Sequence, residues 1–388
     1  VVKEFKEVIK KNRIDCDVFI GGSFAKGTLI KKDNYDIDLF VRFKKSNKDI
    51  TKETQKIAGA VAKKLLWKIE TMQGSREYYR LFPQNGRAFF EIVPVLRIKN
   101  PKDEENVTDL SYFHVSYLKK KGNKFSDQIR LVKSFCQAHG VYGAESYING
   151  FSGYGLECLV VYYGSFMKLL QAIVKIKDRV IIDPAKHYSN SSEAIIKLNE
   201  SKTKSPIVLV DPTYKERNAL AALNEESFII FQKAARDFLN RPSLRLFEDN
   251  TPSPDSLREY ASKKKLEFIH VTFETDRQPG DIAGTKLKKF HRFLESLLKN
   301  EYAFQKGLFS YRGDKEAHSY FVLKRKEIVR KGPPIYMKDH ASAFKKNHKN
   351  TFVKKEVLYA SEHSESGKDF INNFAKESYQ AKSMGILK

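Results

Sequence analysis

The chain has 388 residues, 41% of them hydrophobic, which is enough to bury cores and argues against disorder of the whole chain. Its 71 lysines and arginines outnumber its 47 acidic residues, giving a net charge of +24. This charge predicts an anionic partner, most commonly nucleic acid and next an anionic membrane surface, although a lysine-rich proteome would produce the same composition. The three cysteines and nine histidines show no zinc-site spacing, which predicts reduced thiols in a cytoplasmic protein.

The N-terminal part combines helices and strands. Apolar periodicity predicts a helix over 2–12, strands over 17–20 and 36–43, a helix over 51–72, and strands over 77–82 and 87–96. These elements form a mixed α/β unit, and we place the first domain at residues 1–112.

Residues 113–248 are predicted to form a second, mainly helical domain. Helices are expected over 127–139, 152–174 and 225–239, with glycines in the turns between them. The longest apolar stretch, 151–176, is interrupted by polar residues, so we interpret it as a buried helix rather than a membrane span.

A linker rich in Pro, Ser and Asp, DNTPSPD at 249–255, opens the third domain, 249–388. The expected elements are a strand over 265–274, a helix over 285–299, strands over 301–311 and 317–325, a break at Pro333–Pro334 and a lysine-rich helix over 338–349. A weakly patterned tail follows. The chain is therefore predicted to be an α+β multidomain protein with an α/β C-terminal domain.

One stretch, GGSFAKGTLIKKDNYDIDLF at 21–40, carries the chemistry. Gly21 and Gly22 let the backbone approach a triphosphate closely, and Ser23 begins a helix whose amide N–H groups would face phosphate oxygens. Lys26 adds a positive charge for the same phosphates. A GGS sequence alone is often only a turn.

Three acids complete this pattern. Asp36 and Asp38 are two residues apart on a strand, so their carboxylates project from the same face, and such hard oxygen ligands suit Mg²⁺. Glu91, in the apolar strand FFEIVPVL, is the best candidate for a third carboxylate, because an unpaired acid there would be costly. A lone D-x-D is usually a pair of solvated acids. The full order of GGS, D-x-D strand, helix and buried acid is typical of polymerase-β-like nucleotidyltransferases, which use two metal ions.

The same segment resembles the catalytic head of the archaeal (class I) CCA-adding tRNA nucleotidyltransferases. The resemblance continues in TDLSYFHVSYL, IRLVKSFCQAHGVYGAESYINGFSGYGLECLVVYYGSF, DPTYKERNALAALN and FLNRPSLRLF, and more loosely in FHRFLESLLKNEYAF. It covers nearly the whole chain and is most specific between residues 18 and 245. It implies a polymerase-β-like head, a helical central domain and an α/β C-terminal domain that binds RNA.

The resemblance also implies roles by matching position. Asp36, Asp38 and Glu91 would bind metal and act in catalysis, with Glu91 orienting or deprotonating the primer 3′-hydroxyl. The nucleotide would be contacted by Gly22, Ser23, Lys26, His114, Lys133, Tyr142 and Arg217. Arg217 would help to recognise the base through its planar fork of donors.

Four of these assignments have structural alternatives. His114 would alternatively be a structural histidine with its hydrogen bonds satisfied, and Lys133 a lysine whose ammonium group reaches the surface from an apolar helix. Tyr142 would alternatively only pack in its turn, and Arg217 would form an exposed ion pair. Glu91 is also a departure, because the family usually has Asp as the third acid. One extra methylene would shift a metal ion by about an ångström.

The basic C-terminal part is expected to dock the acceptor stem and elbow of tRNA through shape and phosphate contacts. Candidate contacts on one predicted helix are Lys286, Lys288, Lys289 and His291, and a second patch contains Lys345, Lys346, Lys349, Lys354 and Lys355. A solvated helix face is the alternative for each lysine. A homodimer and the absence of membrane binding are further expectations.

The predicted function is template-independent addition of CCA to tRNA 3′ ends from CTP and ATP, with pyrophosphate release and Mg²⁺ as cofactor. Two alternatives stay open. An A-adding, poly(A) or oligoadenylate-type nucleotidyltransferase would differ in its choice of nucleotide. A catalytically inactive RNA-binding protein would be expected to have lost one of the three acids.

Overall fold

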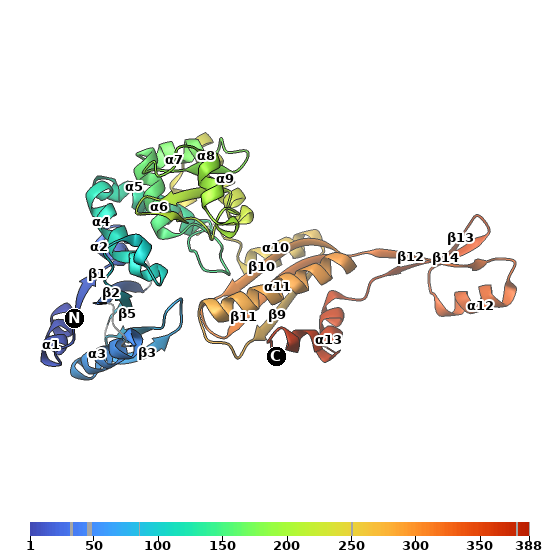
Figure 1. Cartoon of the computed structure of the whole chain (residues 1–388). Coiled ribbons are helices and arrows are strands. Elements are labelled where there is room, and N and C mark those ends of the chain that lie inside the picture. The colour runs from blue at the N-terminus through green and yellow to red at the C-terminus, as the bar shows by residue number, and fades with distance from the viewer. Residues whose placement is uncertain (32–33, 45–48, 85, 250, 378, 388) are drawn as a thin grey trace. The chain divides into compact units, whose positions relative to one another are not determined.

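The computed structural model describes residues 1–388 except 32–33, 45–48, 85, 250, 378 and 388 (Figure 1). The chain divides into two compact units, Val1–Thr251 and Pro252–Lys388, called here the first and second unit. Each has hydrophobic cores of its own. The boundary falls in the predicted linker, of which residue 250 lies outside the described residues. The division into three domains stays a prediction.

The first unit begins with a five-stranded mixed sheet, the head sheet, in the order β1-β2-β5-β4-β3. Its strands are β1 (Cys16–Ile20), β2 (Tyr35–Phe43), β3 (Lys68–Met72), β4 (Tyr78–Phe82) and β5 (Ala88–Leu96). β2 runs parallel to β5, and the other neighbours are antiparallel. The helices α1 (Val2–Lys11) and α3 (Ile50–Leu65) pack against Leu39 and Ile92. Because strand residues alternate between faces, Asp36 and Asp38 lie on the face opposite these helices.

The helix predicted over 51–72 is wrong in its last part. α3 ends at Leu65, since Leu66 adopts the left-handed conformation, with φ of 57°. Lys68–Met72 forms β3 and pairs residue for residue with β4. Hairpin pairing with the next strand in the chain overrides the helical apolar spacing here.

Helices dominate the rest of the first unit. They are α4 (Ser111–Lys121), α5 (Ser126–Ala138), α6 (Gly153–Tyr163), α7 (Phe166–Ile173), α8 (Ser191–Lys197) and α9 (Glu225–Asn240), with short 3-10 helices at Pro101–Asp103, Val107–Leu110, Asn123–Phe125, Glu200–Lys202 and Leu244–Phe247. The helical prediction misses a three-stranded sheet, β6-β7-β8, formed by Val180–Ile182, Ile207–Asp211 and Tyr214–Asn218. Its central strand β7 is buried along its whole length, so the backbone position of its last residue, Asp211, is fixed by the core.

The helix predicted over 152–174 is in fact two helices. Gly164, with φ of 86°, ends α6, and the Ser165 hydroxyl caps α7 by accepting from the backbone amide of Lys168. The helices meet at 97°, and their apolar residues lie in the main core of the first unit. Among the described residues no single helix is long and apolar enough to cross a membrane, and only this bent pair meets both criteria together.

The second unit is built on an antiparallel sheet in the order β10-β11-β9. Its strands are β9 (Glu267–Glu274), β10 (Tyr302–Tyr311) and β11 (Glu316–Arg325). The long helix α11 (Asp281–Glu301) packs on Phe273 and Phe321 of one face, and α10 (Pro254–Lys264) packs on Val322 of the other. The sequence does not predict α10. Ser253 caps it and Pro254 occupies its first turn, so the residues interpreted as linker are also a helix start.

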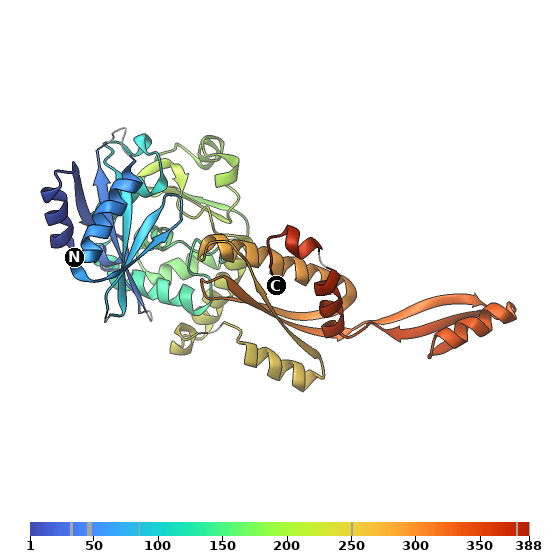
Figure 2. The same ribbon diagram turned by 90° about the horizontal axis from the view of Figure 1, so that it is seen from below.

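A second three-stranded sheet, β12-β14-β13, follows in the same unit (Figure 2). Its elements are β12 (Glu327–Pro334), α12 (Lys338–Asn347), β13 (Thr351–Lys354) and β14 (Val357–His363), and the chain ends with α13 (Gly367–Glu377) and α14 (Tyr379–Ser383). The predicted weakly patterned tail therefore contains regular elements. They are held by long-range contacts, such as that of Ile371 with the core on α11, which local sequence does not reveal.

We predict that Phe231→Ala lowers the stability of the first unit by about 3–5 kcal/mol, because it opens a cavity in a close-packed ring cluster. Phe231 is fully buried, and its ring centroid lies 4.7 Å from that of Phe151 and 5.8 Å from that of Phe135. Urea unfolding is followed by the fluorescence of the single tryptophan, Trp67, which stacks on Phe90 of the head sheet.

The control variant is Ile196→Ala, at a side chain that is 80% exposed, and it is expected to change stability by less than about 0.5 kcal/mol. An unfolding midpoint of Trp67 that does not respond to Phe231→Ala would show that the head sheet unfolds independently of the helical core.

Candidate active site

The turn after β1 lies directly against the acids of β2. The Gly21 amide donates to the Asp38 carbonyl oxygen at 2.9 Å, and the short helix α2 (Gly22–Ala25) follows. Gly22 has φ of +58°, and a Cβ atom there would lie 1.6 Å from the Asp38 Oδ2 atom. Both the conformation and the contact therefore require glycine at this position. Ser23 is placed on α2 and Lys26 directly after it.

The head sheet brings the three predicted acids to one face. In the parallel pair of β2 and β5, Asp38 lies opposite Glu91, and Asp36 precedes Asp38 by two residues. Arg80 of β4, which the sequence prediction missed, lies opposite Glu91 on the other side and donates from Nε to Glu91 Oε1 at 2.8 Å. This arrangement offers hard oxygen ligands on one surface, with one of them already bound to a guanidinium.

The fit to a metal ion depends on side-chain placement. Among the described residues, no three His, Cys, Asp or Glu side chains are gathered closely enough to hold a metal ion as they stand. The backbone register fits such a group and the oxygen donors suit it. Rotation of at least one of the acids Asp36, Asp38 and Glu91 is therefore needed to complete a coordination shell from them.

A buried carboxylate, Glu157 of α6, binds two of the predicted nucleotide contacts. Its Oε2 atom accepts from Lys26 Nζ at 2.6 Å, and its Oε1 atom accepts from Lys133 Nζ at 2.7 Å and from the Thr28 hydroxyl at 2.6 Å. The Glu157 side chain has no exposed area. Burial alone would raise its pKa, but the two ammonium groups overcome this effect and lower the pKa to about 2. Both lysines are thus partly neutralised in the free protein.

A second buried carboxylate, Asp211 at the end of β7, binds Arg217 and His114, two further side chains predicted to contact the nucleotide. Its Oδ2 atom accepts from Arg217 Nη1 at 2.8 Å and lies 3.0 Å from His114 Nε2, and its Oδ1 atom accepts from the Tyr154 hydroxyl at 3.0 Å. Burial would raise the pKa of Asp211, but the hydrogen bond from His114 and the nearby Arg217 charge lower it. Burial lowers the pKa of His114 below its usual value, which favours the neutral imidazole.

Tyr154 connects the two buried clusters. Its ring stacks on His114 with centroids 3.9 Å apart, and Lys26 Nζ and the Arg217 guanidinium lie 5.9 and 5.7 Å from its centroid. Tyr142 is close to Lys133, since a Cβ atom built on Gly153 would lie 3.0 Å from the Tyr142 hydroxyl and 3.9 Å from Lys133 Cε. The predicted nucleotide contacts of the central helices and the lysine of the head thus lie in one neighbourhood.

The sequence prediction missed Arg80, Tyr154, Glu157 and Asp211. A usable signal existed for Glu157, an acid in the apolar helix GYGLECLVVYY, and for Asp211, which ends the apolar strand IVLVD. The same reasoning that selected Glu91 applies to both, because an ionised group in an apolar segment needs partners. The partners of Glu157, and His114 and Tyr154 among those of Asp211, come from other segments and cannot be found by local spacing.

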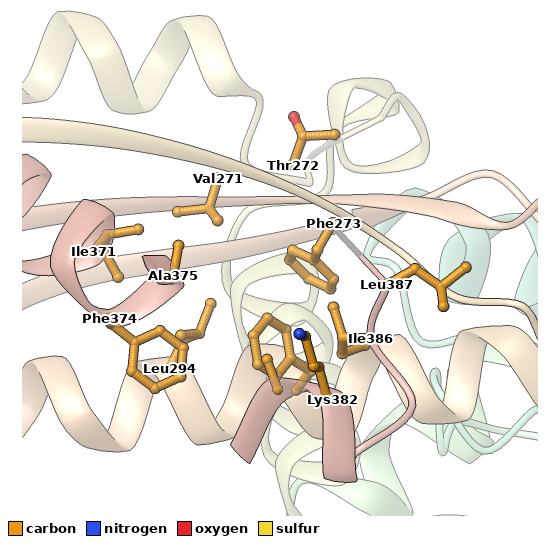
Figure 3. Close-up of a pocket in the computed structure, with 12 residues that line it drawn as sticks. Val271, Thr272, Phe273, Leu294, Ile371, Phe374, Ala375, Lys382, Ile386 and Leu387 are labelled. Carbon is orange, nitrogen blue, oxygen red and sulfur yellow. The ribbon is translucent and has the colours of Figure 1, made fainter. Parts of the chain in front are cut away.

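A cavity of about 340 Å³ lies beside Arg217. Tyr214, Asn218, Ser152 and Glu104 are among the residues that line it with Arg217. A smaller cavity of about 130 Å³ in the second unit is almost wholly apolar and lined by no acid, with Thr272 and Lys382 as its polar side chains (Figure 3). Of these two cavities, only the one beside Arg217 is lined by several polar and charged side chains.

The lysines predicted to contact RNA lie in the second unit, on α11 and α12 and, for Lys349, Lys354 and Lys355, in or beside β13. Lys289 is exposed and Lys286 partly exposed on α11, whereas Lys345 and Lys346 are exposed on α12 and Lys349 lies just beyond it. The prediction that His291 faces RNA is wrong. Its side chain is buried and its Nδ1 atom lies 2.7 Å from the Ser319 hydroxyl, and burial lowers its pKa to about 3. The helix turns this position toward the sheet.

Comparison with known families and proteins gives consistent matches. Residues 2–100 match the nucleotidyltransferase domain, and residues 127–248 match the second domain of tRNA nucleotidyltransferases. The chain is 32% identical over 357 residues to the CCA-adding enzyme of Nanoarchaeum equitans, covering 90% of this chain and 84% of that one. It is 30% identical over 341 residues to the CCA-adding enzyme of Methanosarcina mazei, covering 85% and 72%.

Among solved structures, the chain is similar to the Cid1 poly(U) polymerase, with a TM-score of 0.49 and 13% identity, covering 64% of this chain and 91% of that one. It is also similar to the Escherichia coli CdnC structure, with a TM-score of 0.43 and 15% identity, covering 67% and 87%. The fold is that of a polymerase-β-like nucleotidyltransferase within an α+β multidomain chain.

We predict that Gly22→Ala destabilises the first unit by about 1–3 kcal/mol, because alanine would be strained at φ of +58° and would collide with the Asp38 carboxylate. The matched control is Gly59→Ala in α3, where an added Cβ meets nothing within 4 Å and helix propensity favours alanine by roughly 0.5–1 kcal/mol. Urea unfolding measures both variants. Equal tolerance of the two changes would contradict the contact between the turn and Asp38.

We predict that Glu157→Gln costs about 3–5 kcal/mol at neutral pH, because it leaves two lysines without their buried counter-charge. The stabilisation from Glu157 is present above its unfolded pKa near 4.5 and is lost as the pH falls toward its folded pKa of about 2. The difference in unfolding free energy between the wild type and Glu157→Gln should therefore shrink between about pH 5 and pH 2.

Urea unfolding at a series of pH values tests this expectation. The control is Asp127→Asn on α5, the helix that carries Lys133, since the Asp127 side chain is 83% exposed and its pair with Arg130 is worth less than about 1 kcal/mol. A difference between the wild type and Glu157→Gln that is constant from pH 7 to pH 3 would show that folding does not lower the pKa of Glu157, which would contradict the two buried ion pairs.

Proposed function

The chain belongs to the family of CCA-adding enzymes, and we propose that it adds C, C and A to the 3′ end of tRNA through the acids Asp36, Asp38 and Glu91. It is a nucleotidyltransferase that uses CTP and ATP without a nucleic-acid template and releases pyrophosphate. The observation that carries the catalytic assignment is the pairing of Asp38 with Glu91 across parallel strands, on the face against which Gly22 lies.

Nucleotidyltransferases of this kind typically use divalent metal ions, and we propose Mg²⁺, held by Asp36, Asp38 and Glu91. When bound, such ions reduce the charge that builds on the attacking and leaving oxygens of the displacement. The release of Glu91 from Arg80 would free a carboxylate oxygen on the shared face. Glu91 would then accept a hydrogen bond from the primer 3′-hydroxyl, while Arg80 would stay opposite it on β4.

The nucleotide is proposed to lie between the turn after β1 and the central helices. Gly22 leaves room for close approach of the phosphates, and Ser23 and Lys26 would contact them. Lys133 and Tyr142 would contact the triphosphate and sugar together with His114. Because Glu157 binds Lys26 and Lys133, phosphate oxygens would either compete with the Glu157 carboxylate for the two ammonium groups or bind to them in addition to it.

Arg217 is proposed to recognise the base. A guanidinium carries only hydrogen-bond donors, so a donor fixed opposite the ring nitrogen of the pairing edge favours bases in which that nitrogen is an acceptor. Cytosine N3 and adenine N1 are acceptors, whereas uracil N3 and guanine N1 carry hydrogens. One fixed donor edge beside the cavity of about 340 Å³ would thus accept C and A and disfavour U and G.

The second unit is proposed to dock the acceptor stem and elbow of tRNA. An A-form duplex is recognised mainly by its shape and phosphates, which suits a basic surface. The proposed contacts are Lys286, Lys289, Lys345, Lys346 and Lys349. In this scheme residues 1–112 carry catalysis, 113–248 nucleotide recognition and 249–388 tRNA binding, in a cytoplasmic protein that can form a homodimer. The relatives do not favour the A-adding or inactive alternatives.

We expect a tRNA without its 3′ CCA to be extended by C, C and then A when Mg²⁺, CTP and ATP are present together. Asp38→Asn should lower the rate of addition on the order of 10³-fold or more, with tRNA affinity nearly unchanged, because it removes a catalytic carboxylate and no RNA contact. Gel analysis of the extended tRNA and a filter-binding assay measure the two quantities.

The matched control is Asp15→Asn, at a side chain that is 67% exposed and paired with Lys44 away from the three acids, which should leave the rate within about twofold. Addition of A alone would identify the narrower A-adding class of enzyme. Wild-type rates in Asp38→Asn would remove the three acids from the mechanism.

A further inference from the structure

Asp211, on the sheet β6-β7-β8 of the first unit, accepts hydrogen bonds from several groups although it is not one of the three proposed catalytic acids. Besides Arg217, His114 and Tyr154, its Oδ1 atom accepts from the backbone amide and the hydroxyl of Thr213, both at 2.8 Å. The side chain has no exposed area. Its backbone is fixed as well, because Asp211 ends β7, a strand that is buried throughout. These bonds and the buried strand hold the carboxylate in one orientation.

The bonds divide the carboxylate into two halves with different roles. Oδ1 receives three donors, from Thr213 twice and from Tyr154, and these hold the carboxylate plane. Oδ2 faces Arg217 Nη1 and His114 Nε2. The rigid half thus belongs to the scaffold, and the other half meets two side chains proposed to touch the nucleotide.

Arg217 has more donors than Asp211 uses. A guanidinium has five N–H groups in a fixed plane, and the bond to Asp211 takes one at Nη1. Its side chain keeps 24% of its area exposed, and it lines the cavity of about 340 Å³. A long arginine that pointed freely into this space would sample many rotamers, and each would present a different set of donors to a base.

We propose that Asp211 is the positioning residue that sets base choice, by holding the Arg217 guanidinium so that its remaining donors face the base in one orientation. The inference rests on the proposed function and deepens it. Asp211 does not touch the nucleotide and acts through Arg217. Stacking of His114 on Tyr154, which shares the same carboxylate, ties the position of the proposed sugar or phosphate contact to that of the base contact.

The test is the preference for CTP over UTP, expressed as the ratio of kcat/KM values for addition of one nucleotide to tRNA that lacks its 3′ CCA. Asp211→Asn should lower this ratio at least tenfold, with a higher KM for CTP, because an unheld Arg217 no longer rejects the N3–H group of uracil. Thr213→Ala removes one donor on the rigid half and keeps the amide bond, and its ratio should stay within about twofold of the wild type.

Two further variants complete the design. Arg217→Lys keeps the charge and loses the fork, and adding Asp211→Asn to it should lower the ratio no further, since Asp211 acts through the guanidinium. If Asp211→Asn does not fold, as judged by thermal unfolding, Asp211→Glu replaces it. That change keeps the charge but moves the carboxylate by one methylene, and the ratio should fall at least fivefold.

An unchanged ratio in a folded Asp211 variant, or equal losses with CTP and UTP, overturns the inference, because a merely structural residue would affect both nucleotides alike. Failure of the wild type to extend tRNA would instead refute the proposed function. The two failures are therefore distinguishable in one set of assays.

Discussion

The buried ion pairs of Glu157 hold the first unit's two halves in register. Glu157 and Lys133 come from the central helices, and Lys26 and Thr28 come from the segment between β1 and β2. None of these charged groups could be buried alone, because the cost of desolvating an isolated charge is several kcal/mol. Their mutual contact therefore fixes where the head sheet and the central helices meet, and the proposed nucleotide site lies at that junction.

The head sheet imposes a second constraint, because its strand register places several charged side chains on the same face. The parallel register places Asp38 beside Glu91, and the antiparallel register places Arg80 on the far side of Glu91. Glu91 is one methylene longer than the aspartate that the sequence resemblance implies at this position. Its Oε1 atom accepts from Arg80 Nε at 2.8 Å, so the longer side chain has a partner on β4.

Local chemistry explains what the sequence could predict. The GGS turn, the alternation of Asp36 and Asp38, and Glu91 in an apolar strand are short-range patterns, and the structure places them on one face. Glu157 depends on partners 24 to 131 residues away, and Asp211 binds Tyr154 and His114, 57 and 97 residues away, which periodicity cannot reveal. Other errors have the same origin: β3 is decided by its pairing with β4, and His291 by packing against the sheet that α11 covers.

The formal charges of the side chains at the proposed active site favour the binding of cations there. The carboxylates Asp36, Asp38, Glu91, Glu157 and Asp211 outnumber the cationic side chains Lys26, Arg80, Lys133 and Arg217 by one. A strongly basic protein thus contains, at its proposed active site, a group of side chains whose formal charges sum to a negative value. A nucleoside triphosphate adds several more negative charges, and the lysines near it are already bound to Glu157. We therefore expect the triphosphate to bind next to the three acids together with divalent ions, which would couple substrate binding to assembly of the proposed metal site.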